Sequence, residues 1–150
     1  MKNFKKVKPT EIDENTFKLI GSDWMLITAG NKDSFNTMTA SWGGFGVLWN
    51  KNVCNIFVRP QRYTYEFLEN NENFTLSFFS KEYKKALNIC GTKSGRDIDK
   101  ISEAGLTPVE TDNGTVFFEE ANTVFECKKI YYLDIDPKNF LDPKIDDLYP

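Results

Sequence analysis

The chain of 150 residues has the size of one domain, residues 1–150. With a net charge of -3, it lacks the excess of basic residues on which non-specific nucleic-acid binding depends. Hydrophobic residues make up 40% and aromatic residues 15% of the sequence, enough apolar surface for a core without disulfides or a structural metal. The absence of histidine excludes Ser-His-Asp and Cys-His catalysis and HExxH zinc sites, so enzymatic chemistry would have to come from a bound cofactor.

Six segments rich in threonine, valine, isoleucine and aromatic residues predict β-strands, in chain order at residues 24–29, 35–42, 53–58, 73–79, 115–119 and 123–133. In the fourth of these the apolar residues nearly alternate, as on a strand with one fully buried face. Helical spacing predicts two helices between the strands, at residues 64–70 and 82–90, and a less regular third at residues 97–104. The pattern indicates a mainly β barrel or sandwich with short inserted helices.

The three cysteines, Cys54, Cys90 and Cys127, are an odd number spaced far apart along the chain. This usage favours reduced thiols in a cytosol, and no CxxC pair is present to hold zinc. Cys90 lies on the apolar stripe of its predicted helix, which favours a buried residue over a redox thiol. No run of about 18 apolar residues occurs, so we expect a cytoplasmic protein without a signal peptide or membrane span.

The segment from Arg59 to Thr64 is a candidate phosphate site. An apolar strand ends at Arg59, Pro60 favours an extended exit, and a helix is predicted to start at Thr64. The guanidiniums of Arg59 and Arg62 therefore stand beside the free amides of a helix N-terminus, a combination that suits a phosphate group. The alternative is that both arginines pair with surface carboxylates such as Glu66.

A polar loop with two glycines, residues 91–97, follows the second predicted helix, for which Gly91 is the expected stop. Its flexible amides and its basic and hydroxyl side chains are able to contact an anion. The loop lacks the spacing of a Walker loop, and the cluster from Gly43 to Gly46 lacks that of a dinucleotide fingerprint. Each glycine cluster alone favours an ordinary turn.

The predicted strand from Asn36 to Trp42 carries two small hydroxyl side chains, Thr39 and Ser41, beside Met38. Small side chains let a flat ring approach the backbone, and amide and hydroxyl groups bond the polar edge of a heterocycle. The alternative is a core strand whose hydroxyl groups are satisfied internally.

Taken together and in this order, these segments resemble the flavin reductase-like, FMN-binding split-barrel family, which includes flavoredoxin-type proteins. The resemblance covers nearly the whole chain. It is carried by four ordered motifs: Asn36-Thr-Met-Thr-Ala-Ser-Trp-Gly43, Val58-Arg-Pro-Gln-Arg-Tyr-Thr64, Phe78-Phe-Ser-Lys81 and Cys90-Gly-Thr-Lys-Ser-Gly-Arg-Asp97. Four motifs in order are more specific than any one of them.

The resemblance implies one domain with a six-stranded Greek-key split β-barrel and short added helices. It also implies a homodimer with FMN in a groove near the subunit interface. The residues expected to line the isoalloxazine edge are Met38, Thr39, Ala40, Ser41 and Trp42. Those expected around the phosphate and its arm are Arg59, Arg62, Thr64, Ser80 and Lys81, with Gly91, Ser94 and Gly95 closing the pocket. No residue is nominated as catalytic, and no metal site is expected.

The function implied is that of a NAD(P)H:flavin oxidoreductase, in which NADH or NADPH donates hydride to the flavin and a small-molecule or protein acceptor receives the electrons. Two alternatives stay open. One is a flavoredoxin-like electron carrier without a nicotinamide site of its own, and the other is a non-catalytic barrel that binds a small ligand or an oligonucleotide. The net negative charge counts against an oligonucleotide, and we expect neither nucleic acid nor a membrane as a partner.

The acidic segment 134–150 has weak periodicity and is interpreted as a surface loop or an extension that contacts a partner. Members of the family continue past a segment like Asp147-Leu-Tyr-Pro150 into another strand that returns to the barrel. We therefore expect a shortened or naturally truncated form, a difference that bears on dimer contacts and barrel closure.

Overall fold

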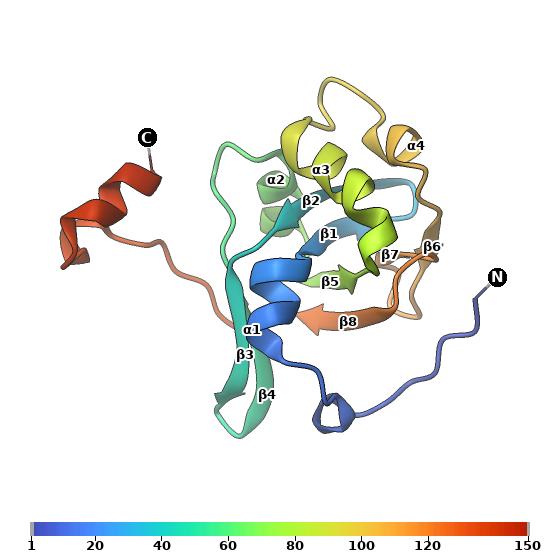
Figure 1. Ribbon diagram of the computed structural model, residues 1–150, viewed down its shortest axis with the longest axis horizontal. Coiled ribbons are helices and arrows are strands. Elements are labelled where there is room, and N and C mark those ends of the chain that lie inside the picture. Colours follow the sequence, from blue (N-terminus) through green and yellow to red (C-terminus); the bar gives the residue numbers. More distant parts are fainter. Residues whose placement is uncertain (1, 150) are drawn as a thin grey trace.

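A four-stranded antiparallel sheet, in the order β2–β1–β5–β8, forms the centre of the molecule (Figure 1). The computed structural model describes residues 2–149. The strands of this sheet are β1 (Met25–Asn31), β2 (Ser34–Ala40), β5 (Asn73–Phe78) and β8 (Thr123–Lys128). All four were predicted from the sequence, with boundaries that differ by at most five residues because strand ends are set by pairing.

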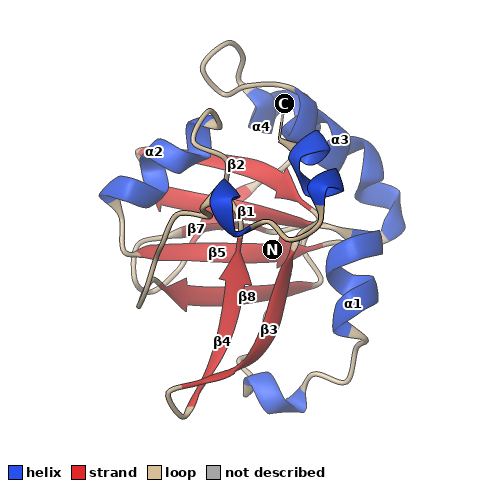
Figure 2. Ribbon diagram, turned by 90° about the vertical axis from the view of Figure 1, so that its left-hand side faces the viewer, coloured by secondary structure: helices blue, strands red, loops and turns tan. Residues whose placement is uncertain are grey.

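A β-hairpin of β3 (Gly43–Leu48) and β4 (Lys51–Ile56) projects from the sheet (Figure 2). Trp49 and Asn50 connect its strands with φ values of 52° and 57°, the two positive angles of a type I′ turn. The prediction that the glycine cluster at Gly43 forms a turn is therefore wrong. The segment is a strand because it pairs along its whole length with β4, a contact that glycine propensity does not reveal.

Short helices flank the sheet, and Figure 1 shows α2 and α3 on the side of β2. They are α1 (Thr16–Lys18), α2 (Tyr63–Asn70), α3 (Lys84–Thr92) and α4 (Lys100–Ala104), with η1 (Pro9–Glu11), η2 (Leu19–Asp23) and η3 (Lys81–Tyr83). A small hairpin of β6 (Pro108–Glu110) and β7 (Val116–Phe118) follows α4. After β8 the chain (orange to red in Figure 1) leaves the sheet on the side of β3 and β4 and forms η4 (Pro137–Asn139) and η5 (Pro143–Leu148).

The two inner strands of the central sheet, β1 and β5, are buried on both faces. Neighbouring residues of β1 point to opposite sides, so Ile27 belongs to one hydrophobic cluster and Leu26 to the other. The first cluster lies against α2 and the β3–β4 hairpin, where Phe45 packs against Phe78 and Phe125. The second lies under α3 and includes Cys90, which is fully buried, as its helical position predicted.

The mainly β class with short helices is confirmed. The six strands predicted from the sequence correspond to β1, β2, β4, β5, β7 and β8, whereas β3 and β6 were not predicted as strands. Within residues 2–149 the strands form three separate sheets that do not close into one continuous barrel. No helix in this part of the chain is long and apolar enough to cross a membrane.

Candidate functional site

Three of the four sequence motifs meet beside β2, the edge strand of the central sheet. Asn36 Nδ2, near the start of β2, donates a hydrogen bond of 2.8 Å to Thr64 Oγ1 in the first turn of α2. Arg62, just before that helix, donates to the Gly91 carbonyl at 3.2 Å, near the end of α3. The fold thus brings the strand, the arginine segment and the 91–97 loop into contact.

In the β2 segment the side chains divide between the core and the surface. Met38 and Ala40 are buried in the first hydrophobic cluster, so only their backbone groups are left to face a ligand. The Thr39 hydroxyl donates to the Leu87 carbonyl of α3, so the alternative of an internally satisfied hydroxyl holds for this residue. Ser41 is half-buried, and Trp42 is 43% exposed where the strand ends.

The two arginines carry positive charge that no carboxylate neutralises within residues 2–149. Glu66, the partner considered from the sequence, instead pairs with Arg96, so the alternative of arginine–Glu66 pairing is wrong. Arg62 is half-buried, and this burial, followed by the nearby charge of Arg59, lowers its pKa from the ordinary value. Two guanidiniums held close together without a counter-charge form a site suited to an anion.

The segment after β8 reaches back to this site. Arg59 Nη2 donates to the Leu148 carbonyl at 2.5 Å. The Arg59 guanidinium also lies 5.3 Å from the Tyr149 ring centroid and 5.8 Å from that of Trp42, within cation–π range. The C-terminal segment therefore contacts Trp42 and Arg59, two of the predicted site residues. Within residues 2–149 the guanidinium of Arg59 makes no other hydrogen bond, so it has further N–H donors for a ligand.

Helix α2 begins at Tyr63, one residue earlier than predicted, with Arg62 at the N-cap. No side chain caps this end, so backbone amides of the first turn are available to an anion. The Thr64 side chain is fully buried and its oxygen accepts from Asn36. The predicted phosphate contact of Thr64 is thus limited to its backbone amide.

The glycines of the 91–97 loop allow a close approach to β2 and α2. Gly91 lies inside α3, so its predicted role as the helix stop is wrong. A Cβ at this position would lie 3.1 Å from Thr39 Cβ. A Cβ on Gly95 would lie 2.1 Å from Asn36 Oδ1, a distance that only glycine avoids. Ser94 holds the turn, because its Oγ accepts from the Arg96 amide.

Lys100 is a residue of this site that the sequence analysis missed. It is 4% exposed, and its Nζ donates to the carbonyls of Cys90 and Lys93 at 3.2 and 3.3 Å. Burial lowers the pKa of Lys100 to about 8, helped by the charge of Arg62. A lysine in a predicted helix gives no local sign of burial, and Asn36, the first residue of its motif, was likewise not named as a site residue.

Ser80 and Lys81 come from a different part of the fold from the other predicted residues. They follow β5, which is separated from β2 by β1 in the sheet. Ser80 Oγ donates to Glu82, and Lys81 is exposed. No hydrogen bond or ion pair within residues 2–149 connects them to Arg59 or Arg62, and their role near the ribityl-phosphate arm stays a prediction.

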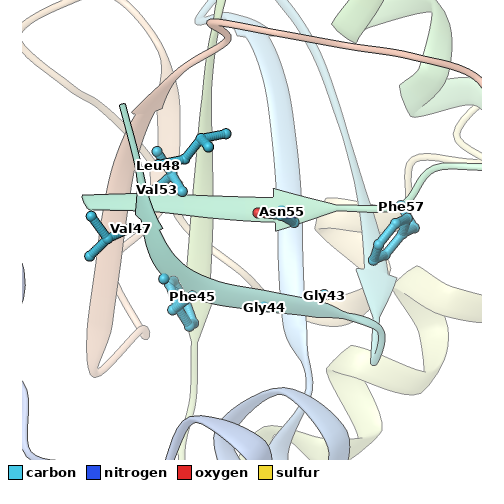
Figure 3. Close-up of a pocket in the computed structure, with 9 residues that line it drawn as sticks. Gly43, Gly44, Phe45, Val47, Leu48, Val53, Asn55 and Phe57 are labelled. Carbon is cyan, nitrogen blue, oxygen red and sulfur yellow. The ribbon is translucent and has the colours of Figure 1, made fainter. Parts of the chain in front are cut away.

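A surface pocket of about 390 Å³ opens on the β3–β4 hairpin (Figure 3). Its lining comes from β3, β4 and the residue after them, and includes Phe45, Val47, Val53 and Phe57. The pocket begins at Gly43, next to Trp42, so it adjoins the arginine site without containing it. Within residues 2–149 no cluster of three or more cysteine, aspartate or glutamate side chains is placed to hold a metal ion.

Comparison with known proteins links this geometry to one family. Flavoredoxin of Desulfovibrio vulgaris (Miyazaki F) is 25% identical, with a TM-score of 0.69 over 89% of this chain and 69% of that chain. Flavoredoxin from Methanosarcina acetivorans is 21% identical, with a TM-score of 0.68 over 89% of this chain and 68% of that one. An FMN-binding domain of a flavin reductases-like enzyme from Shewanella baltica OS155 is 18% identical. Its TM-score is 0.66 over 87% of this chain and 65% of that chain.

The last two similarities show the shared fold alone. The model of the flavin reductase like domain, in contrast, matches residues 17–136, which contain every predicted site residue. This chain belongs to the family of flavin reductase like domains.

Proposed function

We propose that this flavin reductase-like domain binds FMN through Arg59 and Arg62 and oxidises NADH or NADPH, passing the electrons to a small-molecule or protein acceptor. The observation that carries the proposal is the pair of arginines that has no carboxylate partner within residues 2–149, beside the uncapped start of α2. A phosphate monoester carries a charge near -2 at neutral pH, which such a pair neutralises through charge-assisted hydrogen bonds.

The remaining residues fit the other parts of FMN. The main chain from Met38 to Ser41 runs along the edge strand, where its outward N–H and C=O groups are able to bond the polar edge of the isoalloxazine ring. Trp42 offers an exposed apolar surface beside Arg59. Gly91 and Gly95 keep the 91–97 loop close to β2, and so fix the width of the site.

The chemistry needs little more from the protein than position. Bound FMN would accept a hydride equivalent from the nicotinamide and release electrons to the acceptor. With no histidine in the chain, the residues contribute binding, orientation and exclusion of water rather than an imidazole acid or base. We name no catalytic residue.

A second candidate is an electron carrier without a nicotinamide site of its own. The similarity to flavoredoxin of Desulfovibrio vulgaris favours it, since that structure has a TM-score of 0.69 to this chain. Reduction by the nicotinamide distinguishes the two functions, because only a reductase reacts directly with NADH or NADPH.

We also propose that the chain forms a homodimer through the β3–β4 hairpin. Val47 is 74%, Leu48 46% and Trp49 57% exposed on this hairpin, and Phe57 is 45% exposed just after it. A cluster of exposed large apolar side chains is typical of an interaction surface. The pocket in Figure 3 lies on the same surface and would be covered by the second copy.

The test begins with FMN and riboflavin titrations of the purified protein, followed by visible absorption and flavin fluorescence. We expect FMN to bind more tightly than riboflavin, which lacks the phosphate, and to stay with the protein on gel filtration. No spectral change with either flavin would overturn the proposed cofactor. Equal affinity for the two flavins would overturn the phosphate role of the arginines.

The flavin-loaded protein is then mixed with NADH or with NADPH in the absence of oxygen. Rapid bleaching of the flavin absorption by either nucleotide supports the reductase. If dithionite bleaches the flavin but neither nucleotide does, the reductase proposal fails and the electron carrier is favoured.

A further inference from the structure

The fold brings together two cysteines that are far apart in the sequence. Cys54 lies on β4 and Cys127 on β8, and their Sγ atoms are 3.6 Å apart. Their spacing along the chain predicts separate thiols, because no two cysteines are close in sequence. The structure instead places a pair of free thiols in hydrogen-bond contact across two different sheets.

Packing holds the two thiols at the contact between the β3–β4 hairpin and the central sheet. Phe45, the partner of Cys54 in the hairpin register, has its ring centroid 4.7 Å from that of Phe125, two residues before Cys127. Both cysteines pack against the first hydrophobic cluster, yet both are only half-buried. A small reagent is therefore able to approach a pair that the fold holds in position.

The two thiols differ in acidity. The hydrogen bond between them lowers the pKa of Cys54 and raises the pKa of Cys127, with burial raising the pKa of both. Cys54 is thus the thiol that ionises first. The Cys127 thiol, which also lies 3.7 Å from the Phe125 carbonyl, would then donate its hydrogen to the Cys54 thiolate. A pair in which one thiol stabilises the thiolate of the other is suited to thiol–disulfide exchange.

We propose that Cys54 and Cys127 form a redox-active dithiol site, which a small-molecule disulfide of the glutathione type converts to an intramolecular disulfide. The Cys54 thiolate attacks one sulfur of the oxidant, forming a mixed disulfide and releasing one thiolate. Cys127, after losing its proton, attacks Sγ of Cys54 and releases the second thiolate. Two electrons pass from the protein to the oxidant, and the two protons lost by Cys54 and Cys127 are taken up by the two released thiolates near neutral pH.

The disulfide would link the hairpin covalently to β8. Its formation requires the two sulfur atoms to move from 3.6 Å apart to a bond length of about 2.05 Å. The bond would also restrict the unfolded chain, because the residues it joins are far apart in sequence. Oxidation should therefore raise the thermal midpoint. The proposal requires no bound flavin.

The experiment uses the full chain, reduced and desalted, and then incubated with oxidised glutathione. Alkylation under denaturing conditions, followed by mass spectrometry, counts the remaining thiols. We expect three alkylated cysteines in the reduced protein and one in the oxidised protein, and a loss of about 2 Da before alkylation. Dithiothreitol should restore all three thiols.

Two variants make the test specific. Cys90→Ala is the matched control: Cys90 is fully buried in α3, and burial raises its pKa to about 11, so this variant should still lose two thiols on oxidation. Cys54→Ser should lose the intramolecular disulfide.

The same oxidised wild-type protein is digested without reduction, which keeps the proposal testable even if a variant fails to fold. A fragment that contains both Cys54 and Cys127 supports the proposal. Three reactive thiols after oxidation, a link that involves Cys90, or disulfides between two chains only would each overturn it.

Discussion

At the scale of single residues, the three arginines of the sequence have different surroundings. Arg96 forms an ion pair with Glu66, and its guanidinium lies 4.5 Å from the centroid of the Tyr63 ring. Its charge is therefore already balanced by a carboxylate of the same chain. Arg59 and Arg62 make no ion pair within residues 2–149, and the burial of Arg62 makes its charge harder to solvate. The difference gives a direct test of the proposed phosphate site, with Arg96 as the internal control.

Arg62→Ala should weaken FMN binding by about 1 to 3 kcal/mol, because the phosphate loses a charge-assisted hydrogen bond, and should change riboflavin binding little. Fluorescence titration with the two flavins measures both. Arg96→Ala, which removes an arginine that is already paired, should leave the ratio of FMN to riboflavin affinity near that of the wild type. Equal losses for both flavins in Arg62→Ala would contradict the phosphate role.

Lys100 predicts a pH dependence of stability. Burial lowers its pKa to about 8 in the folded protein, whereas the ordinary lysine value is 10.5. Between these values the unfolded chain binds more protons, so this group makes the free energy of unfolding rise with pH. Below about pH 8 the charged side chain disfavours folding by up to roughly 3 kcal/mol.

Urea unfolding of the wild type and of Lys100→Gln, from about pH 7 to about pH 10.5, checks this expectation. The wild type should gain stability relative to the variant as the pH rises. Cys90, whose pKa burial raises to about 11, titrates in both proteins, so the comparison removes most of its contribution. If the difference in the free energy of unfolding between wild type and variant does not change with pH, Lys100 keeps an ordinary pKa.

At the scale of elements, the site depends on how closely the 91–97 loop lies against β2 and α2. Gly95 is the critical position, since a Cβ would meet Asn36 Oδ1 at 2.1 Å and Tyr63 at 3.4 Å. Asn36 is not free to move away, because it is buried and bonded to Thr64. The backbone of the loop would have to shift instead, away from the site.

Gly95→Ala should therefore lower the free energy of unfolding by about 1 to 3 kcal/mol, the usual range for an overpacked site, and weaken FMN binding as the loop moves. Chemical denaturation and flavin titration measure the two effects. Gly21→Ala is the matched control, because nothing lies within 4 Å of a Cβ there. Equal behaviour of the two variants would refute the close packing at Gly95.

At the scale of the whole molecule, the β3–β4 hairpin leaves large apolar side chains exposed that the central sheet does not cover. The C-terminal segment also exposes apolar residues, among them Leu141 at 97%, but these lie outside the hairpin surface. The proposed dimer uses the hairpin, so the two regions should differ in their effect on assembly.

Val47→Lys should weaken the dimer by at least about tenfold, because a charged side chain without a partner is costly to bury in an interface. Sedimentation equilibrium over a range of protein concentrations measures the dissociation constant. Leu141→Lys, which changes an apolar residue of the C-terminal segment that is even more exposed than Val47, should leave the dimer intact. A monomeric wild type, or equal effects of the two substitutions, would count against the hairpin interface.

The prediction of the site from the sequence was partial. Motif order identified the arginine segment and the 91–97 loop, and the structure places both beside β2. It did not reveal that the Thr64 hydroxyl is bonded to Asn36, or that Arg96 rather than Arg62 pairs with Glu66. Those partners lie about 30 residues away along the chain, so no local pattern points to them.

The sequence by itself determined the mainly β class, most of the strands and helices, and the family, because propensity, alternation and short motifs are properties of neighbouring residues. Only the tertiary structure decided that the glycine-rich segment at Gly43 is strand β3, that Lys100 is buried, and that Cys54 and Cys127 touch. Each of these depends on pairing or packing between distant parts of the chain, which sequence neighbours do not encode.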